Sequence, residues 1–386
     1  MKLRIVAAVV AVVALACSSS GSNSSKGSGA SSGSTGSGFS SYSSTAPATN
    51  PGDIVSDEPY GNLNGGSTID AHRIEYLSGG ATVTGAVLAP NGTPPPGGWP
   101  VIAWDHGTTG LADRCAPSRS ADLSGYAVGL VPLVQSGFVV AATDYPGLGS
   151  NGPHPYLDGG SEGLATIDIV RAARHVVPAA STTWFAVGHS QGGQAALFAG
   201  ELAPTDGAGL DLAGVVAAAP ASQLPVYTRA LGTPAQVFVA MIVSGVVATD
   251  PSVHLSDLLS PAAMAKADVL ETGCNAEIGK AFASINPLLV PGGDTNPALV
   301  SYLARNDPGH RPTSAPVLLV QGDADTTVLP VLTNLLLKSM CGQGDTVALK
   351  TYAGAGHTDV LLRAIGDVRT FIAARLAGTA ASSTCN

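Results

Sequence analysis

The chain has 386 residues, of which 45% are hydrophobic and only 12% are charged, so it can bury one large core. Its formal net charge of -9 would repel a phosphate backbone, and no cluster of basic and aromatic residues occurs along it. We therefore expect one large domain with accessory segments, and no nucleic-acid partner.

The first 16 residues are typical of an export signal. Lys2 and Arg4 supply a positive end, Ile5–Leu15 an apolar run too short to span a bilayer, and Ala14–Ala16 a small-residue cleavage site. Cleavage would leave Cys17 first, where a bacterial lipoprotein carries its acyl chains. Either Cys17 is lipidated and anchors the chain to a membrane, or the cysteine is incidental. We expect an exported protein, either a cell-surface lipoprotein or a secreted one.

A low-complexity segment follows this signal. From Ser18 to about Ser44 nearly all residues are Ser, Gly or other small residues, which leaves nothing to bury. Such a segment behaves as a flexible tether. We assign residues 1–16 to the signal peptide, 17–60 to the tether and 61–386 to the globular domain.

From Thr68 onward, short β-rich runs alternate with helical patterns, which is typical of a mostly parallel sheet covered by helices on both faces. The fold class is therefore α/β. The expected strands are Ile69–Tyr76, Ala81–Leu88, Val101–Trp104, Phe138–Thr143, Trp184–Val187, Leu212–Ala218, Val317–Val320 and Val347–Tyr352. The expected helices include Gly163–Val176, Gly193–Leu202, Val331–Met340 and Val360–Leu376.

This alternation breaks between about Ala221 and Arg311, where Pro-punctuated helical segments replace the strands. We interpret the stretch, about residues 222–311, as an inserted cap. Its run from Ala235 to Ala248 is strongly apolar yet too short to cross a membrane. The run therefore either packs onto the core or lines a cavity for an apolar substrate.

The motif G-x-S-x-G occurs at Gly188–Gly192, around Ser190. A nucleophilic Ser in this motif must lie on a sharp turn between a buried strand and a helix. Ser190 has that context, because it follows the apolar run Trp184–Val187 and precedes the helical pattern Gly193–Phe198. Ser190 is therefore the candidate nucleophile.

The same motif occurs twice more, around Ser31 and around Ser161. Ser31 lies in the tether, with no strand or helix beside it. Ser161 is interpreted as the N-cap of a helix that begins near Glu162. Neither has the strand-turn-helix context of a nucleophile.

A Ser hydroxyl needs a base within hydrogen-bond reach and an acid that orients the base, and in this fold they follow in the order Ser, acid, His. His357 lies in a Gly-rich loop after the last expected strand, and it is the candidate base. The stretch Gln321–Val328 offers two carboxylates directly after an apolar strand. We choose Asp325 as the acid, since Asp323 is better placed to bond the backbone of its own turn.

Acyl transfer also needs two N–H donors for the developing oxyanion, one usually from the residue after the Ser and one from the loop after the third strand. The first would be Gln191. For the second we choose Thr108 in the Gly-containing loop that follows Trp104, with Gly107 and Asp105 as alternatives.

Apart from Cys17 the chain has four cysteines, an even number that indicates two disulfides in an oxidising compartment. They are Cys115, Cys274, Cys341 and Cys385. Metal binding is the weaker alternative, because none of the four forms a C-x-x-C pair and no His lies at ligand spacing.

Taken together, these motifs resemble those of the secretory lipase family of α/β-hydrolases, which includes the fungal lipase A type and many actinobacterial secreted lipases. The likeness runs from about Ile69 to Cys385. The stretches that carry it are His106–Gly110, Cys115–Ser118, Asp144–Gly149, Gly188–Gln194, Gly322–Val328 and Gly354–His357.

The resemblance implies the α/β-hydrolase fold with a helical cap before the acid, hydrolysis of carboxylic esters through an acyl-enzyme, and no cofactor or metal. It places the triad on Ser190, Asp325 and His357. The fungal members lack the His-Gly-Thr stretch of this chain, so the second oxyanion donor is not fixed by the resemblance. The family also suggests the disulfides Cys115–Cys274 and Cys341–Cys385, a pairing that suits the chain order.

We therefore expect an exported lipase or esterase that acts on triacylglycerol or another acyl ester. The alternatives are a cell-envelope acyltransferase that uses the same triad, and a catalytically silent binding protein, against which the complete triad argues. A cap of roughly ninety residues predicts a preference for medium to long acyl esters. The cap residues expected to bury the acyl chain are Val237, Phe238, Val239, Met241, Ile242, Val243 and Val246.

Overall fold

The computed structural model describes residue 39 and residues 47–61, 63, 68–226 and 236–385. The expected signal peptide, Cys17, Ser31 and most of the expected tether lie outside these ranges. Within them, no helix is both long and apolar enough to cross a membrane.

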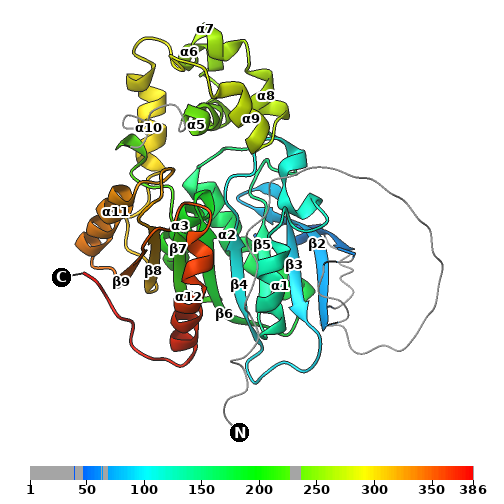
Figure 1. Ribbon diagram of the computed structural model, residues 1–386. Coiled ribbons are helices and arrows are strands. Elements are labelled where there is room, and N and C mark those ends of the chain that lie inside the picture. The colour runs from blue at the N-terminus through cyan, green and yellow to red at the C-terminus, as the bar shows by residue number, and fades with distance from the viewer. Residues whose placement is uncertain (1–38, 40–46, 62, 64–67, 227–235, 386) are drawn as a thin grey trace.

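The described strands form one nine-stranded sheet in the order β1-β2-β3-β5-β4-β6-β7-β8-β9 (Figure 1). The first three strands and β5 pair antiparallel, whereas every pair from β5 to β9 is parallel. The strands are β1 (Ile54–Pro59), β2 (Ile69–Ser78), β3 (Ala81–Pro90), β4 (Trp99–Asp105), β5 (Val139–Thr143), β6 (Ala180–His189), β7 (Asp211–Ala218), β8 (Val317–Gly322) and β9 (Val347–Tyr352). The expected α/β class is confirmed.

Strand β1 corrects the expected tether, which extended to residue 60. Ile54–Pro59 pairs antiparallel with β2, so the last residues assigned to the tether already belong to the sheet. Asp57 and Glu58 lie within the strand, and the Asp57 carboxylate bonds the ring of His72 on β2. An edge strand tolerates charges and a proline, and for that reason its sequence does not show a strand-like apolar alternation.

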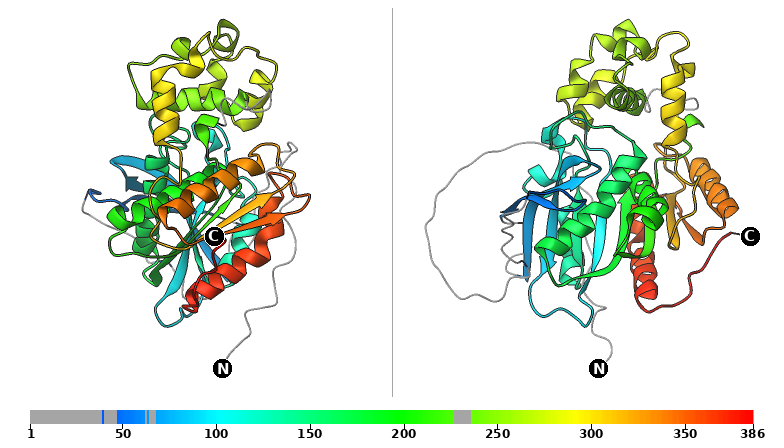
Figure 2. Two further views of the ribbon diagram at one scale, coloured as in Figure 1. Left: turned by 90° about the vertical axis from the view of Figure 1, so that its left-hand side faces the viewer. Right: turned by 180° about the vertical axis from the view of Figure 1, so that it is seen from behind.

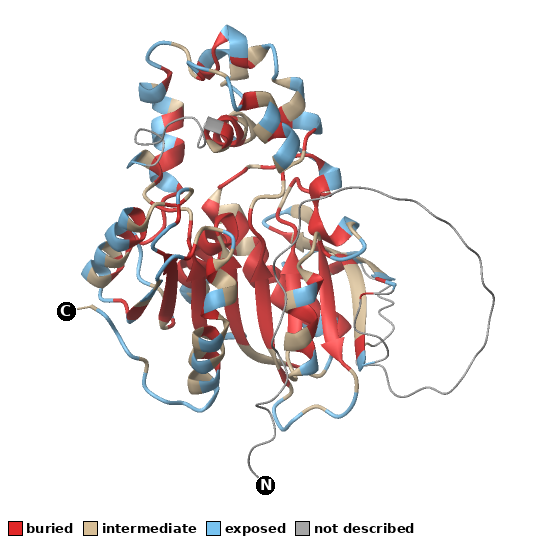
Figure 3. Cartoon of the chain, viewed as in Figure 1, coloured by how far each residue is buried: buried red, intermediate tan, exposed pale blue. Residues whose placement is uncertain are grey.

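Helices cover both faces of the sheet (Figures 1 and 2). Successive residues of a strand therefore pack into two different hydrophobic cores, one on each face. On β6, Trp184 packs with α2 (Gly159–Val176), α3 (Gln191–Asp206) and α11 (Pro330–Gln343). Its neighbour Phe185 packs on the opposite face with α1 (Ala127–Gln135) and α12 (Val360–Leu376). The central strands of the sheet are therefore buried on both sides, as their red colour in Figure 3 shows.

Between β7 and β8 a layer of helices lies beyond one edge of the sheet, over the ends of the parallel strands (Figure 1). They are α5 (Gln236–Thr249), α6 (Leu255–Leu258), α7 (Pro261–Met264), α8 (Asp268–Thr272), α9 (Asn275–Phe282) and α10 (Pro297–Arg305). These helices have a hydrophobic core of their own, to which α5 contributes Met241 and Ile242 and α9 contributes Ile278 and Phe282. We call this layer, from residue 236 to 305, the cap.

Two disulfides are present, Cys115–Cys274 and Cys341–Cys385, the pairing that the family resemblance suggested. The first joins the loop after β4 to the start of α9 in the cap. Backbone hydrogen bonds accompany it, from the Asn275 N–H to the Thr109 carbonyl (2.8 Å) and from the Leu111 N–H to the Gly273 carbonyl (3.4 Å). We call this junction of residues 109–111 with 273–275 the seam.

Candidate active site

Ser190 occupies a sharp turn between β6 and α3. Its φ of 59° and ψ of -119° are strained for a residue with a side chain, and the turn closes tightly around it. A Cβ at Gly188 would lie 2.0 Å from the Gly192 carbonyl oxygen, and one at Gly192 would lie 1.9 Å from the Asp105 carbonyl oxygen. The motif therefore needs glycine at both positions for a steric reason.

The environment of Ser161 differs from that of Ser190. Helix α2 begins at Gly159, and its N-cap is Asp158, whose side chain accepts a hydrogen bond from the Ser161 N–H (3.4 Å). The expectation that Ser161 caps this helix is wrong, because the helix begins earlier, at two glycines that the pattern did not include. Ser161 lies in the first turn of an ordinary helix.

The structure brings Ser190, His357 and Asp325 into one hydrogen-bonded chain. The Ser190 Oγ lies 2.9 Å from His357 Nε2, and His357 Nδ1 lies 2.8 Å from Asp325 Oδ2. A carboxylate only accepts, so Nδ1 carries the proton and Nε2 is left to accept from the hydroxyl. This is the arrangement in which an imidazole can take a proton from a serine.

Asp325 is buried, and its carboxylate is surrounded by donors. Oδ1 accepts from the Thr327 and Val328 N–H groups at 2.8 and 2.9 Å, and Oδ2 accepts from the Gln321 side chain at 3.3 Å. Burial raises the pKa of Asp325, but the hydrogen bond and charge of His357 and the two backbone donors outweigh it and lower this pKa overall. The group is thus a carboxylate at neutral pH.

Asp323 takes no part in this chain. Its exposed carboxylate accepts a hydrogen bond of 2.6 Å from the Gly354 N–H. Gly354 lies in the loop that carries His357. The expectation that Asp323 bonds its own turn is therefore wrong, since its partner is in a loop that only the tertiary fold brings near. Asp323 holds two loops together, and Asp325 faces the imidazole.

His189 contacts the same loop from the elbow, a role that the sequence did not reveal. Its Nε2 lies 2.7 Å from the His357 carbonyl oxygen, and the two rings are 4.6 Å apart at 45°. Burial, with a contribution from His357, lowers the pKa of His189 to about 4, so the ring is neutral at neutral pH and donates its Nε2–H. His189 therefore fixes the main chain of His357.

The loop after β4 contains the candidates for the second oxyanion donor. The Gly107 N–H is engaged by the Tyr126 hydroxyl at 3.2 Å, whereas the Thr108 N–H makes no hydrogen bond within the described part of the chain. The Thr108 hydroxyl lies 2.7 Å from the hydroxyl of Tyr156. Asp105 lies beneath the elbow, where its carboxyl accepts from Thr166 at 2.7 Å and burial raises its pKa well above the usual value. The Thr108 amide is therefore available to an oxyanion, whereas the Gly107 amide is bonded to Tyr126.

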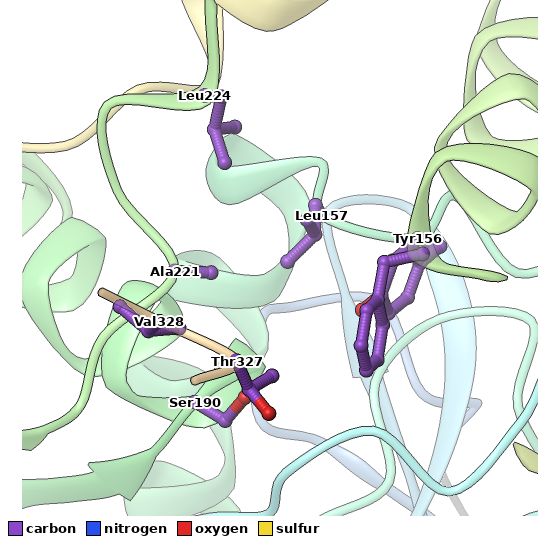
Figure 4. Close-up of a pocket in the computed structure, with 8 residues that line it drawn as sticks. Tyr156, Leu157, Ser190, Ala221, Leu224, Thr327 and Val328 are labelled. Atoms are coloured by element: carbon purple, nitrogen blue, oxygen red, sulfur yellow. The ribbon is translucent and has the colours of Figure 1, made fainter. Parts of the chain in front are cut away.

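A narrow pocket, open to solvent, lies beside Ser190 (Figure 4). Its walls are mostly apolar, and they come from the loop before α2, from the segment that follows β7, from α5 and from the acid loop. The lining residues are Tyr156, Leu157, Ser190, Ala221, Leu224, Phe238, Thr327 and Val328.

Helix α5 contributes one side chain to this pocket. Phe238 lines it and packs against Leu332 of α11. The other six apolar cap residues expected to line it are buried in the core of the cap: Val237, Val239, Met241, Ile242, Val243 and Val246. For these six the expectation is wrong, because each side chain is buried in that core and none of them lines the pocket.

Within the described residues, no group of three or more His, Cys, Asp and Glu side chains could hold a metal ion.

Comparison with known proteins agrees with the motifs. A family model described as secretory lipase matches residues 121–292, slightly less than half of the chain, including the elbow and much of the cap. No curated protein matches the chain.

Several solved structures share the fold. The rice cell wall degrading esterase LipA from Xanthomonas oryzae has a TM-score of 0.69 and 21% identity, covering 85% of this chain and 98% of that one. Candida antarctica lipase A in its closed state has a TM-score of 0.74 and 16% identity, covering 87% of this chain and 84% of that one. A putative hydrolase from Legionella pneumophila has a TM-score of 0.72 and 18% identity, covering 82% and 98%.

These structures share the α/β-hydrolase fold with this chain, and the family match adds ester hydrolysis. The resemblance to the secretory lipases that the sequence indicated is therefore confirmed, and the chain is a carboxylic ester hydrolase of the α/β-hydrolase fold.

Proposed function

We propose that the chain is an exported serine hydrolase in which Ser190 is the nucleophile, His357 the general base and Asp325 the acid. One observation carries this proposal: the unbroken hydrogen-bonded chain from Ser190 Oγ through the imidazole to the buried carboxylate of Asp325. A strained elbow, which presents the hydroxyl beside an apolar pocket, supports it.

In the first half of the reaction, Ser190 Oγ attacks the carbonyl carbon of an ester while its proton passes to His357 Nε2. The carbonyl oxygen becomes an oxyanion, for which the N–H groups of Gln191 and Thr108 are the proposed donors. Gln191 is suited to this task because it begins α3, where N–H groups have no partner within the helix. As the intermediate collapses, His357 returns the proton to the leaving alcohol and the acyl group stays on Ser190.

In the second half, a water molecule loses its proton to His357 Nε2 and attacks the acyl-enzyme, releasing a carboxylic acid and restoring the Ser190 hydroxyl. Asp325 remains ionised throughout, since its pKa is lowered, and it stabilises the imidazolium that forms twice in each cycle.

We propose that the substrate is an ester with an apolar acyl group, such as a triacylglycerol. The pocket beside Ser190 has an apolar surface, from which a bound acyl chain would displace water. This surface is formed by Leu157, Leu224, Phe238 and Val328. A polar acyl group would lose its hydration there without a compensating partner.

Export is part of the proposal and is supported by the two disulfides, which persist in oxidising compartments. We further propose that residues 1–16 are removed and that Cys17 anchors the chain to a membrane. Replacement of Cys17 by Ser tests the anchor: the expected result is release of the protein from the membrane fraction into the soluble one.

Labelling by a fluorophosphonate probe tests the nucleophile. The folded wild-type protein should be labelled and should hydrolyse p-nitrophenyl esters, and both reactions should be lost in Ser190→Ala. Ser161→Ala is the matched control, because it changes the same motif in the wrong context. Labelling that persists in Ser190→Ala would refute the assignment.

A further inference from the structure

Three buried polar side chains lie directly behind the oxyanion donor that we assign to Gln191. The Gln191 Nε2 amide lies 2.8 Å from Glu162 Oε1 and 3.1 Å from His154 Nε2. Glu162 and Gln191 are on α2 and α3, and His154 is in the loop before α2. All three are buried, Glu162 completely.

The proton positions in this cluster follow from its geometry. His154 Nδ1 lies 2.8 Å from the Pro146 carbonyl oxygen, which can only accept, so the proton is on Nδ1 and the lone pair of Nε2 faces Gln191. Burial lowers the pKa of His154 to about 4, which agrees with a neutral ring. The two hydrogens of the Gln191 amide therefore have two acceptors, His154 and Glu162.

Glu162 Oε1 accepts a second hydrogen bond, from the Leu157 N–H at 3.0 Å. Burial raises the pKa of Glu162 well above the usual value. One oxygen of the Glu162 carboxyl thus accepts from both the side chain of Gln191 and the backbone of Leu157.

Leu157 is a wall of the substrate pocket and is held at both of its backbone groups (Figure 4). Its φ is 64°, a conformation that side chains seldom adopt, and it needs support from its surroundings. Glu162 binds its N–H, and the Gln194 side chain on α3 donates to its carbonyl at 3.2 Å. The carboxyl of Glu162 therefore connects the wall of the pocket to the residue that follows Ser190.

The effect on the reaction is one of alignment. An oxyanion donor stabilises the transition state only if its N–H already points at the developing charge. Two acceptors hold the amide end of the Gln191 side chain. They therefore restrict the movement of the Gln191 backbone and keep its N–H in one orientation. Small displacements of such groups cost large factors in rate.

We propose that Glu162 is a positioning residue for ester hydrolysis, which fixes the Gln191 oxyanion donor and the Leu157 wall through one carboxyl oxygen. It touches neither the substrate nor the reacting atoms. The inference rests on the proposed function, since it assumes that Ser190 is the nucleophile and that the Gln191 N–H binds the oxyanion.

Replacement of Glu162 by Met tests it, because Met fills the space but cannot accept a hydrogen bond. We expect kcat to fall about 10- to 100-fold, while KM changes less than threefold. The affinity for a boronic acid that forms a tetrahedral adduct with Ser190 should fall by a similar factor. Glu162→Gln keeps the accepting oxygen and should restore most of the lost kcat.

Asp168→Asn is the matched control. Asp168 is a buried carboxyl on the same helix, but it pairs with Arg171 at 2.6 Å, away from the elbow. Removal of its charge should lower the melting temperature of the protein but should not cause the selective fall in kcat expected for Glu162→Met. All rates are measured at a temperature where circular dichroism shows each variant folded.

Gln191→Ala supplies a test that does not depend on the folding of the Met variant. It removes the clamped side chain and keeps the backbone N–H, so kcat should fall to a similar extent. The kcat of the double variant Glu162→Met with Gln191→Ala should be no more than about twofold below that of the slower single variant. Both changes remove the same hydrogen bond, between Gln191 and Glu162.

A Glu162→Met enzyme with kcat within twofold of wild type, or with an effect confined to KM, would overturn the inference. So would fully multiplicative losses in the double variant, or a Glu162→Gln enzyme as slow as the Met variant. A wild-type protein that neither hydrolyses esters nor reacts with the fluorophosphonate would instead overturn the proposed function, and the inference with it.

Discussion

The side chains at the catalytic edge of the sheet and those of the cap that covers it are positioned in different ways. At the edge, the nucleophile is fixed by a local backbone constraint, the two glycines around Ser190, and His357 follows a Gly-rich stretch. In the cap, most apolar residues pack against one another, and of the α5 side chains that the structure describes Phe238 reaches the pocket. A motif can therefore locate the chemistry of the edge, whereas the same reasoning assigns cap residues to the wrong surface.

The sharpest way to break this comparison is at the nucleophile. Ser190→Ala should lower kcat by roughly a millionfold, since removal of a triad serine leaves only binding and the oxyanion donors. The melting temperature should remain close to that of the wild type. Residual hydrolysis above about a thousandth of the wild-type rate, in a preparation free of other esterases, would contradict the edge assignment.

The two neighbouring carboxylates of the acid loop provide a finer test. Asp325→Asn should lower kcat by about 10⁴-fold, because the amide cannot hold the imidazole in the required tautomer. Asp323→Asn should cost less than tenfold, since its side chain only bonds the Gly354 N–H at the surface. Steady-state rates of both purified variants at pH 8 compare them directly, and the opposite ranking would move the acid to Asp323.

In the cap, two apolar residues of α5 should have opposite effects. The specificity constant of the wild type should rise from butyrate to octanoate by up to about a hundredfold, at about 0.8 kcal/mol for each buried methylene. Phe238→Ala should reduce that rise about tenfold. Ile242→Ala should leave the rise intact but destabilise the protein by about 2–5 kcal/mol, because it opens a cavity in the cap core.

Hydrolysis of a p-nitrophenyl ester series and urea unfolding measure the two effects separately. If Ile242→Ala changed the chain-length profile and Phe238→Ala did not, the pocket would lie on the other side of α5. A flat profile in the wild type would mean that its substrate is a small ester.

The smallest expected effect is a pH dependence where the cap rejoins the sheet. On α3, the carboxyl of Glu201 accepts from the Gly309 N–H at 2.6 Å and lies 3.7 Å from Arg311, with His310 and Asp345 also nearby. Burial raises the pKa of Glu201 to about 7, against the weaker lowering effects of the Gly309 N–H, Arg311 and His310, while the charge of Asp345 adds slightly to the rise.

A raised pKa means that the folded state binds the proton more tightly than the unfolded state does. Glu201 therefore contributes stability below about pH 4.5, and this contribution is lost as the pH rises toward 7, by at most about 3 kcal/mol. Urea unfolding of the wild type and of Glu201→Gln between pH 4.5 and 8 measures it as the difference between the two curves. Parallel curves would show that the carboxyl titrates alike in both states.

Much of the fold could be predicted because its signals are local. The parallel strands are apolar runs, and the helix Val360–Leu376 has the bounds that its periodicity indicated. Strand β1 was missed because an edge strand carries charges, and α1 because Gly129 and Pro132 interrupt its pattern.

At the site, the spacing of motifs brought Ser190, His357 and Asp325 to attention, and the structure places them within hydrogen-bonding distance. The groups around them could not be foreseen. His189 and Glu162 act on partners that lie 168 and 29 residues away in the chain, and nothing in the adjacent sequence marks either one. Their roles arise only when separate segments pack together.

The seam between residues 109–111 and 273–275 has a consequence for the exchange of caps between related enzymes. Since Cys115, Thr109 and Leu111 are bonded to the cap, the loop that presents Thr108 is shaped by a segment more than 150 residues away. A chimaera that receives only a foreign cap would leave the Cys115 thiol without Cys274. The loop after β4 would also lose its hydrogen bonds to residues 273–275. The transferable module in this architecture is the cap together with the loop after β4.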